Sequence, residues 1–435
     1  MEFSLTEIEY PLDFRKEDAY RLGEHLRLRH SVAIVGMKRV GISNFLRFFL
    51  YHPHISETYI HKSEKHTLIA VDLNDLVERE LYAFWTLVFK RIVDTAEKIE
   101  LDDSLRLKIE ALFLSSIQSH DLFLLIDGVR KSLSYLIEDG YIPTLFFLRF
   151  DRIKDVVTPE FFANLEGLKE SLHTKLAYVF TSFRGLDELS PKAFSKASFS
   201  AFTETMYLLP SGRKDREIIY KTYEKRYELS TTSLVAQEIL ELAGGYVQYL
   251  QIALVLLHEK RSDVLDPEIV RLTLLQDERI TLQSEELWES LTNQEKMILL
   301  KMFHKEDIDD SEIKQGEYMI KIGLVRKEKG YYVLFSPLFA HFIKKYVIDS
   351  EQKKRGVVFS KKESLLFEFL QQHIGEIAER EEIIDAVWPE YVEFGVSDWS
   401  IDRLVARVRS KLKDQASPYE IKTVRTRGYV LISKV

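Results

Sequence analysis

Apolar and polar positions follow two different periods along the N-terminal part of the chain. Short apolar runs that are typical of buried strands alternate with longer segments in which apolar residues recur at helical spacing. Strands that alternate with helices predict a mainly parallel sheet covered by helices on both faces, here an α/β domain over residues 1–205. The predicted strands are residues 31–36, 67–73, 144–151 and 176–182, and the predicted helices include residues 43–51 and about 80–100.

The middle of the chain is predicted to be helical and charged, with one break at Ala243-Gly244-Gly245. We expect residues 206–285 to form a helical lid. Residues 286–350 have the order helix, helix and a hairpin that turns at Gly330, which is the outline of a winged helix. The polar segment SEQKKRG at residues 350–356 then predicts a flexible linker to a separate domain over residues 356–435.

The last predicted helix has one apolar and one basic face. Ile401, Val405, Val408 and Leu412 recur at 4-3-4 spacing, which places them on one stripe of a helix. The same geometry places basic side chains opposite this stripe. A basic face of this kind fits the major groove of DNA, where arginine contacts guanine or phosphate. The opposite face carries Trp399, Arg403, Arg407 and Lys411, with Arg409 to one side.

A basic hairpin is predicted to follow this helix. After a turn at Ser417-Pro418, two β-rich runs at Tyr419–Val424 and Tyr429–Ile432 flank the segment Arg425-Thr426-Arg427-Gly428. Arginines at such a tip have the reach to enter a minor groove. Charged helices usually face water, so the helix alone is also compatible with a solvated surface beside an ordinary hairpin. Helix and hairpin together favour a winged helix that binds double-stranded DNA.

The segment from Gly356 to Val435 resembles the OmpR/PhoB-type winged-helix family of transcription regulators. Four motifs carry the resemblance in order: FSKKESLLFEFL, AEREEIIDAVWPE, the basic helix and IKTVRTRGYVLI. The resemblance implies a transcription regulator that binds specific DNA sequences. Two positions, Leu404 and Ala406, lie where the family often has polar or basic groups, and Trp399 replaces a common arginine. The implied DNA-contact positions are Trp399, Ser400, Arg403, Leu404, Ala406, Arg407, Arg409, Thr423, Arg425 and Arg427, and the basic face adds Lys411.

The charge of the chain is distributed unevenly. The 435 residues have a net charge of −8, whereas residues 397–435 carry nine Lys and Arg against four Asp and Glu, a local charge of +5. The remaining residues therefore carry −13, so DNA binding must depend on the C-terminal patch. The length predicts about three domains, and a hydrophobic content of 46% is sufficient for large cores.

The chain contains no cysteine, which excludes disulfides, thiolate zinc sites and cysteine nucleophiles. The N-terminal segment lacks the basic-then-apolar pattern of a signal peptide, and the apolar stretches are too short for a membrane span. The histidines have no HExxH spacing, so no metal site is predicted. These features predict a cytoplasmic protein without a membrane partner.

A glycine-rich loop is predicted between the first strand and the helix that follows it. Residues 36–43, GMKRVGIS, follow the spacing G-x-x-x-x-G-K-[ST], in which backbone amides hold phosphates and lysine reaches the β and γ oxygens. Both glycines and Ser43 match, but Ile42 replaces the lysine, and Lys38 and Arg39 lie elsewhere in the loop. The substitution removes a principal electrostatic contact with a transferred phosphoryl group.

Three further segments bear on nucleotide chemistry. The predicted third strand ends at Asp151, which is placed to support Mg²⁺. The next residue is Arg152, at the position where related ATPases have a catalytic carboxylate. Arginine does not act as a base toward water. The segment Thr181 to Arg184 is a candidate polar sensor. The pair Gly244-Gly245 either breaks a helix or begins a lid helix that faces a nucleotide.

Residues 12–348 resemble the AAA+ and STAND classes of P-loop ATPases, in particular archaeal-type ATPases with a C-terminal winged helix. The likeness rests on GMKRVGISNFLR, LFFLRFDRI, YVFTSFR and AGGYVQYLQIA in this order. Enzyme activity is not expected to carry over, because Ile42 and Arg152 depart from the pattern. Three hypotheses stay open: a tight turn without a ligand, ATP or ADP bound without hydrolysis, and hydrolysis. The candidate nucleotide-binding residues are Gly36, Lys38, Arg39, Gly41, Ser43 and Asp151.

Three functions are therefore in competition. The first is a sequence-specific DNA-binding transcription regulator, in which a degenerate P-loop domain serves as a sensor or an oligomerisation platform. The second is an active STAND-type switch driven by a nucleoside triphosphate, and the third is a protein-interaction scaffold that uses its winged helices. The basic helix and hairpin favour the first. Proteins of the OmpR/PhoB type often bind direct repeats as dimers, so a homodimer or a larger homo-oligomer is expected.

Overall fold

The computed structural model describes residues 6–193, 203–260, 266–353, 359–388, 398–414, 417–424 and 427–433. The chain divides into two compact units. The N-terminal unit comprises Met1–Leu274 and Asn293–Pro337, and the C-terminal unit comprises Leu275–Thr292 and Leu338–Val435. The finer division into four domains, with borders near residues 205, 285 and 350, stays a prediction.

The N-terminal unit is built on a five-stranded sheet. Its strands are β1 (Ser31–Val35), β2 (Lys65–Asp72), β3 (Tyr141–Leu148), β4 (Ala177–Ser182) and β5 (Thr203–Tyr207). Every neighbouring pair is parallel, in the order β2-β3-β4-β1-β5, which confirms the predicted parallel sheet. All residues of β1 and β4 are buried, as expected for inner strands with helices on each side. Two details differ from the prediction: β3 ends at Leu148 rather than at residue 151, and β5 is an additional strand.

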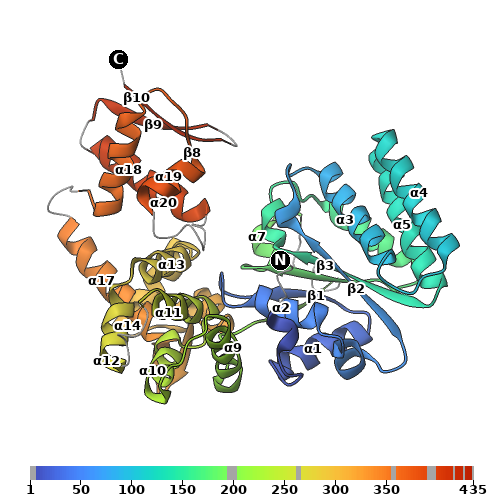
Figure 1. Ribbon diagram of the computed structural model, residues 1–435, viewed down its shortest axis with the longest axis horizontal. Helices are drawn as coiled ribbons and strands as arrows, with labels where there is room; N and C mark the ends of the chain where they lie inside the picture. The colour runs from blue at the N-terminus through green and yellow to red at the C-terminus, as the bar shows by residue number, and fades with distance from the viewer. Residues whose placement is uncertain are drawn as a thin grey trace. The chain divides into compact units, whose positions relative to one another are not determined.

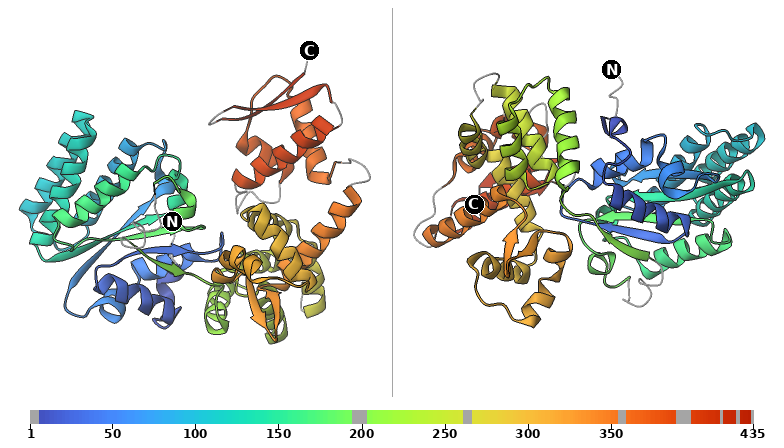
Figure 2. Two further views of the ribbon diagram at one scale, coloured as in Figure 1. Left: turned by 180° about the vertical axis from the view of Figure 1, so that it is seen from behind. Right: turned by 90° about the horizontal axis from the view of Figure 1, so that it is seen from below.

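Helices cover both faces of this sheet. They are α1 (Lys16–Arg27), α2 (Ile42–Tyr51), α3 (Leu81–Ala96), α4 (Asp103–Ser119), α5 (Leu122–Glu138), α6 (Pro159–Ser171) and α7 (Leu186–Leu189). The group α3, α4 and α5 lies on one face, and α1 and α2 lie on the other (Figures 1 and 2). Phe84 of α3 packs against Phe147 of β3 and Phe161 of α6 in the larger core. On the opposite face, the ring of Phe49 in α2 lies 6.3 Å from that of Phe146 in β3.

A helical lid and a small hairpin complete the N-terminal unit. The elements after the sheet are α9 (Arg213–Arg226), α10 (Ser233–Ala243), α11 (Val247–Lys260), α12 (Pro267–Gln276), α14 (Asn293–His304), α15 (Asp310–Gln315), α16 (Glu317–Lys321), β6 (Val325–Glu328) and β7 (Tyr331–Leu334). The predicted break separates α10 from α11, where Gly244 and Gly245 have φ angles of 59° and 84°. A Cβ atom at Gly244 would collide with the carbonyl of Phe335, so glycine lets the end of the hairpin approach the lid. The hairpin turns at Gly330, as predicted.

The C-terminal unit contains the predicted winged helix. Its elements are α13 (Glu278–Glu289), α17 (Pro337–Lys353), α18 (Lys361–Gln372), β8 (Ala378–Glu379), α19 (Arg380–Val387), α20 (Asp398–Asp414), β9 (Tyr419–Val424) and β10 (Gly428–Ser433). The strands form an antiparallel sheet in the order β8-β10-β9 beside α18, α19 and α20 (Figure 2). Trp388, Val405 and Leu431 are fully buried in one shared core, which holds the hairpin against the helices.

Candidate nucleic-acid interface and phosphate-binding loop

The apolar stripe of α20 packs into the core of the winged helix, as predicted. The four residues of the stripe are at most 3% exposed. Ser400 and Leu404 are also buried, with exposed fractions of 8% and 1%. Neither side chain therefore lies on the exposed basic face, and the DNA-contact position that the resemblance implied at Leu404 is wrong for this chain, because that side chain fills the core. The stripe consists of Ile401, Val405, Val408 and Leu412.

The basic face of α20 lies against carboxylates of the same unit. Nη2 of Arg403 lies 2.7 Å from Oε1 of Glu289, and Nη1 of Arg407 lies 2.7 Å from Oε1 of Glu285. Both glutamates belong to α13. The two arginine side chains are 33% and 27% exposed, so each still borders solvent. The predicted basic face is therefore formed, with its two central arginines in ion pairs.

Lys411 lies at the other end of this face and pairs with Glu363 of α18. Glu363 also caps its own helix, because its carboxylate accepts a hydrogen bond from the amide of Ser360 at 2.7 Å. Burial alone would raise the pKa of Glu363, but the bonds from Lys411 and Ser360 offset this effect and hold the pKa below its ordinary value. Lys411 is therefore fixed at the junction of α18 and α20.

Arg409 joins the helix to the hairpin. Its Nε donates to the carbonyl of Ile421 at 2.8 Å, and its Nη2 donates to Oγ1 of Thr423 at 2.7 Å. Two predicted DNA-contact residues, Arg409 and Thr423, thus bond to each other. Since both bonds connect α20 with β9, Arg409 positions the hairpin relative to the recognition helix.

A polar cluster at the start of α20 was not identified from the sequence as part of the interface. Arg380, the first residue of α19, donates to Asp402 at 2.6 Å and pairs with Asp398 at 3.2 Å. The hydroxyl of Tyr429 in β10 donates to the same Asp402 carboxylate, and burial together with this carboxylate raises the pKa of Tyr429 to about 12. The cluster ties α19, α20 and β10 together and so orients the basic face.

The tip of the hairpin is basic and solvent-facing in the part that the structure describes. The Arg427 side chain is 61% exposed. Gly428 follows it, and a Cβ atom there would collide with the carbonyl of Ala378 in β8, so glycine permits the close approach of β8 and β10. Arg425 and the side chain of Trp399 lie outside the described residues.

The glycine-rich loop joins β1 to α2 in the N-terminal unit, as predicted. Gly41 has a φ angle of 115°, a conformation that favours glycine, and a Cβ atom there would lie 2.6 Å from Cγ2 of Val247. Arg39 also adopts a left-handed conformation, with a φ angle of 60°. The loop therefore has the tight turn of the template, and Ser43 at its end is exposed.

Ile42 starts α2 at the position of the template lysine. The side chain is half-buried, and its Cδ1 lies 3.4 Å from the point that a Cβ atom on Gly36 would occupy. Val40 approaches the same point at 3.1 Å. Apolar groups thus pack across the loop at the place from which a lysine would reach the β and γ phosphates.

The carboxyl end of β3 differs from the prediction. The strand ends at Leu148, and Asp151 lies beyond it in the short helix η4 (Phe150–Ile153) rather than at the strand end. Burial raises the pKa of Asp151. The residue directly after the strand is Arg149, whose guanidinium pairs with Asp72 at the end of β2. Asp151 is therefore not the strand-end carboxylate that the pattern predicted, and an arginine holds that place.

Three basic side chains near the loop and the strand ends, those of Arg152, Lys38 and Arg184, contact other groups of the protein. Nη1 of Arg152 donates to the side-chain carbonyl of Asn74 at 2.7 Å. Nζ of Lys38 lies 4.8 Å from the centre of the Phe183 ring. Arg184, at the candidate sensor, forms a buried pair with Glu295 at 2.5 Å and stacks 3.7 Å above the ring of Tyr318. The predicted sensor arginine thus joins β4 to the segment of α14 and α16.

The lid touches the loop directly. The hydroxyl of Tyr246 donates to the carbonyl of Lys38 at 2.5 Å, and Val247, the first residue of α11, lies against Gly41. The pair Gly244-Gly245 therefore both breaks the helix and brings the start of α11 to the loop.

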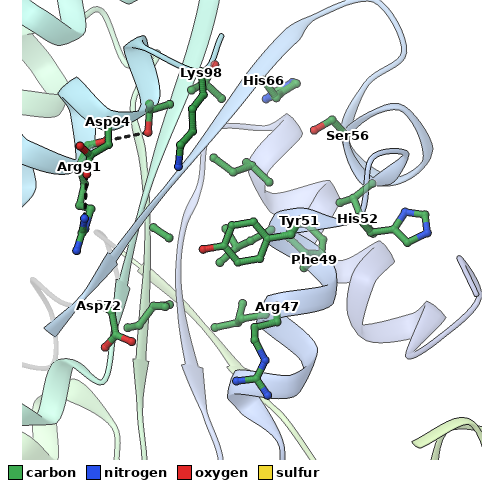
Figure 3. A pocket seen from close by; sticks show the side chains of 18 of the residues that line it. Arg47, Phe49, Tyr51, His52, Ser56, His66, Asp72, Arg91, Asp94 and Lys98 are labelled. Carbon is green, nitrogen blue, oxygen red and sulfur yellow. Dashed lines mark hydrogen bonds and ion pairs between the residues drawn. The ribbon is translucent and has the colours of Figure 1, made fainter. Parts of the chain in front are cut away.

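A cavity of about 690 Å³ opens beside α2 and extends from Ser43 to Lys98 (Figure 3). Its size is that of a small-molecule site. Arg91 on its wall pairs with Asp75 and Asp94, at 2.6 and 2.8 Å. These two pairs satisfy the charge of Arg91, and Lys98 also lines the cavity.

Within the described ranges, no three histidine, aspartate or glutamate side chains lie together in a group that could hold a metal ion. No helix in the same ranges is long and apolar enough to cross a membrane.

Comparisons with known proteins agree on the C-terminal part. The family described as "Transcriptional regulatory protein, C terminal" matches residues 353–431. The chain is 36% identical over 90 residues to the cholera toxin transcriptional activator of Vibrio cholerae. This match covers 20% of the chain and spans 30% of the length of that relative. The chain thus carries an OmpR/PhoB-type winged-helix domain at its C-terminal end.

Solved structures of archaeal P-loop ATPases are similar to a larger part of the chain. The Walker-type ATPase of Pyrococcus abyssi shares 17% identity and a TM-score of 0.46, over 76% of this chain and 95% of that one. The ORC2 protein of Aeropyrum pernix shares 12% identity and a TM-score of 0.47, over 80% of this chain and 98% of that one.

Proposed function

We propose that the protein is a sequence-specific DNA-binding transcription regulator whose C-terminal winged helix binds DNA through α20 and the β9–β10 hairpin. The observation that carries the proposal is the position of Arg403 and Arg407, on the side of α20 that is turned away from the core. A helix with arginines on its exposed side fits the major groove, where a bidentate arginine identifies guanine. Lys411 and Arg409 adjoin this side and are assigned mainly to positioning.

The hairpin tip is assigned to the DNA backbone or a narrow minor groove. Arg427 precedes β10 and is exposed, and Arg425 follows β9 in the sequence. Arginine at such a tip contacts phosphate or the minor groove largely without regard to base sequence. Since the rest of the chain is acidic, these contacts supply a large share of the attraction to DNA.

The N-terminal unit is proposed to be a sensor or an oligomerisation platform that does not hydrolyse nucleotide. The loop turns of Gly36 and Gly41 and the exposed Ser43 are compatible with ATP or ADP held by backbone amides. Ile42 and Arg152 stand at the two positions where the resemblance implies the lysine and the catalytic carboxylate that hydrolysis requires. A homodimer on direct repeats of DNA and a location in the cytoplasm are part of this proposal.

The contact of the lid with the loop favours a second candidate function, a nucleotide-dependent switch. Tyr246 and Val247 contact the loop, so a movement of the loop on binding phosphate would be transmitted to α11 through these contacts. The two candidates differ in turnover, because only an active switch cycles between ATP and ADP.

Binding to DNA at several salt concentrations tests the main proposal. The full chain should bind duplex DNA with an affinity that falls as salt rises, at a slope near −0.9 for each phosphate contact. Replacing Arg425 and Arg427 together by alanine should reduce this slope by about one to two contacts for all sequences. An affinity for duplex DNA that is insensitive to salt would contradict the proposal, and a lost base preference at an unchanged slope would contradict the role of the hairpin.

A further inference from the structure

The helix α13 carries a stripe of acidic side chains on one side. Spacings of seven and four residues align Glu278, Glu285 and Glu289 along the helix, and Leu282 lies on the same side. Leu282 is packed against the core of the winged helix. Each of the three glutamates forms an ion pair with α18 or α20, so the acidic stripe faces the winged helix within the C-terminal unit.

The two central arginines of α20 are bound to this stripe. Arg403 pairs with Glu289 and Arg407 with Glu285, each at 2.7 Å. The glutamate side chains are only 20% and 12% exposed, so water screens the pairs less than on an open surface. The groups best placed to contact DNA are therefore occupied by carboxylates of the same chain.

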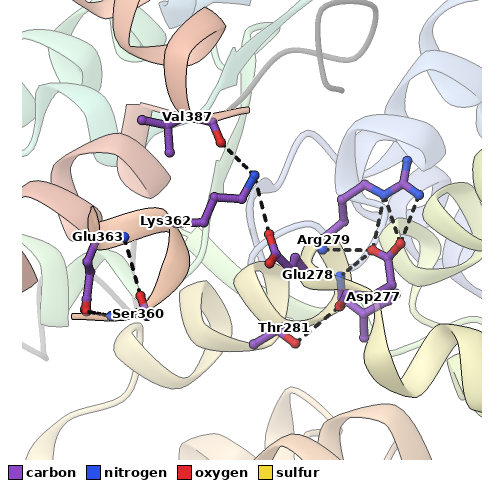
Figure 4. A network of polar contacts seen from close by, with 9 residues as sticks. Asp277, Glu278, Arg279, Thr281, Ser360, Lys362, Glu363 and Val387 are labelled. Atoms are coloured by element: carbon purple, nitrogen blue, oxygen red, sulfur yellow. Dashed lines mark hydrogen bonds and ion pairs between the residues drawn. The ribbon is translucent and has the colours of Figure 1, made fainter. Parts of the chain in front are cut away.

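A third contact fixes the register of α13. Nζ of Lys362 in α18 lies 3.4 Å from the carboxylate of Glu278 and donates to the carbonyl of Val387 at 2.7 Å (Figure 4). Asp277 caps the start of the helix through the amide of Arg279 at 2.8 Å (Figure 4). The N-terminal end of α13 is thus held on a part of the winged helix that is outside the recognition helix.

The basic face of α20 cannot contact α13 and DNA at the same time. Carboxylates and phosphates present similar oxygen acceptors to the guanidinium fork, so Glu285 and Glu289 take the bonds that DNA would accept. The major groove is about 12 Å wide, and a helix with its side chains is about 10–12 Å across. The groove therefore admits α20 alone but not α20 with a second helix on its basic side.

We propose that α13 is an inhibitory helix that covers the recognition helix, with Glu285 and Glu289 in the place of DNA. DNA binding then requires the displacement of α13. The proposal rests on the proposed function of α20 as the DNA-binding helix. The chain enters α13 from the N-terminal unit after Leu274 and returns to that unit at Asn293, so a change of state there is covalently connected to the inhibitory helix.

Charge removal on α13 tests the proposal in the full chain. Glu285→Gln with Glu289→Gln keeps the side-chain shape but removes both ion pairs with α20. Glu368→Gln with Glu381→Gln is the matched control, since it removes two carboxylates from exposed positions of α18 and α19 that do not contact α13. The probe is a duplex DNA pool of random sequence, with hydrogen exchange of residues 398–414 as a second measurement. Circular dichroism checks that each variant keeps its helical content.

The double variant should bind the DNA pool about 5–30-fold more tightly than the wild type, the factor that one or two kcal/mol produces. Its α20 amides should exchange faster without DNA, and the control Glu368→Gln with Glu381→Gln should change neither quantity by more than about twofold.

Equal affinity of the wild type and the double variant would overturn the inhibitory helix. The proposed function would stand if Arg403→Ala with Arg407→Ala then weakened binding. If neither the wild type nor the double variant bound DNA, the proposed function would fail. In that case hydrogen exchange still tests whether α13 covers α20. Unchanged exchange of the α20 amides in the double variant would refute this contact.

Discussion

At the scale of single residues, the role of Arg407 is open to a direct test. It lies at the middle of the basic face of α20, one turn from Arg403. The replacement Arg407→Ala is best made together with Glu285→Gln and Glu289→Gln, because the 2.7 Å pair with α13 is then absent and only the 3.9 Å pair with Glu363 remains. In this background it should weaken specific binding by roughly 1–3 kcal/mol and relax the preference at one base pair, as expected for a lost bidentate contact.

The measurement for Arg407 is a gel-shift titration on a selected sequence and on single-base variants of it. Lys413→Ala, an exposed lysine on the same helix, is the matched control. Unchanged affinity and unchanged base preference would contradict the assignment of α20 as the recognition helix.

A second residue-scale prediction concerns Ile42. The purified protein should release no phosphate from ATP above background, even with Mg²⁺ and DNA. Losing one preorganised charge contact typically costs about 10²–10³-fold in rate, and here Ile42 stands at the lysine position and Arg152 at the position of the catalytic carboxylate. The change Ile42→Lys alone should not restore turnover, because Arg152 still occupies the position of the catalytic carboxylate and arginine does not act as a base toward water.

A phosphate-release assay with Ser43→Ala and Asp151→Ala as a background control decides this prediction. Release by the wild type above that control would favour the nucleotide-driven switch. Binding of labelled ATP or ADP without release would instead support a sensor that retains nucleotide.

At the scale of elements, the packing of α1 can be tested through two helical glycines. Gly23 lies in the middle of α1, where a Cβ atom would collide with the carbonyl of Tyr59 in the short helix η2 (Ser56–Ile60). Gly167 lies in α6, where a Cβ atom would meet no atom within 4 Å. Alanine is favoured over glycine in helices by about 0.5–1 kcal/mol, so Gly167→Ala should stabilise the protein slightly.

Gly23→Ala should instead lower the melting temperature, because α1 or η2 must shift to relieve the clash. Thermal unfolding of the two variants side by side gives the measurement. Equal and small effects of the two changes would show that η2 moves away from α1 at little cost.

At the scale of the whole molecule, the buried pair of Arg184 and Glu295 joins residues 111 positions apart within the N-terminal unit. Their side chains are 8% and 6% exposed. Glu295→Gln removes the negative charge that balances the buried guanidinium of Arg184. The change should destabilise this unit by up to about 3–5 kcal/mol. The double replacement Arg184→Met with Glu295→Met should cost less, because apolar side chains of similar volume avoid a buried charge.

Urea unfolding of the single and double variants separates these outcomes. A double variant less stable than Glu295→Gln would mean that the pair contributes net stability beyond its desolvation.

The sequence by itself determined the features that arise from local periodicity. The 4-3-4 spacing of Ile401, Val405, Val408 and Leu412 was sufficient to predict α20 and its buried side, because a helix presents its residues at a constant angle. The parallel sheet followed in the same way from short apolar runs between helices. The break at Gly244 followed from the freedom of glycine to take positive φ angles.

Only the tertiary structure decided which distant groups meet. The pair of Arg407 and Glu285 joins residues 122 positions apart, and no local pattern connects the acidic stripe of α13 with the basic face of α20. The burial of Ser400 and Leu404, and the end of β3 before Asp151, likewise depend on how complete elements pack. Side-chain pairing between elements is set by their relative placement, and a one-dimensional pattern of hydrophobic and charged positions does not contain that placement.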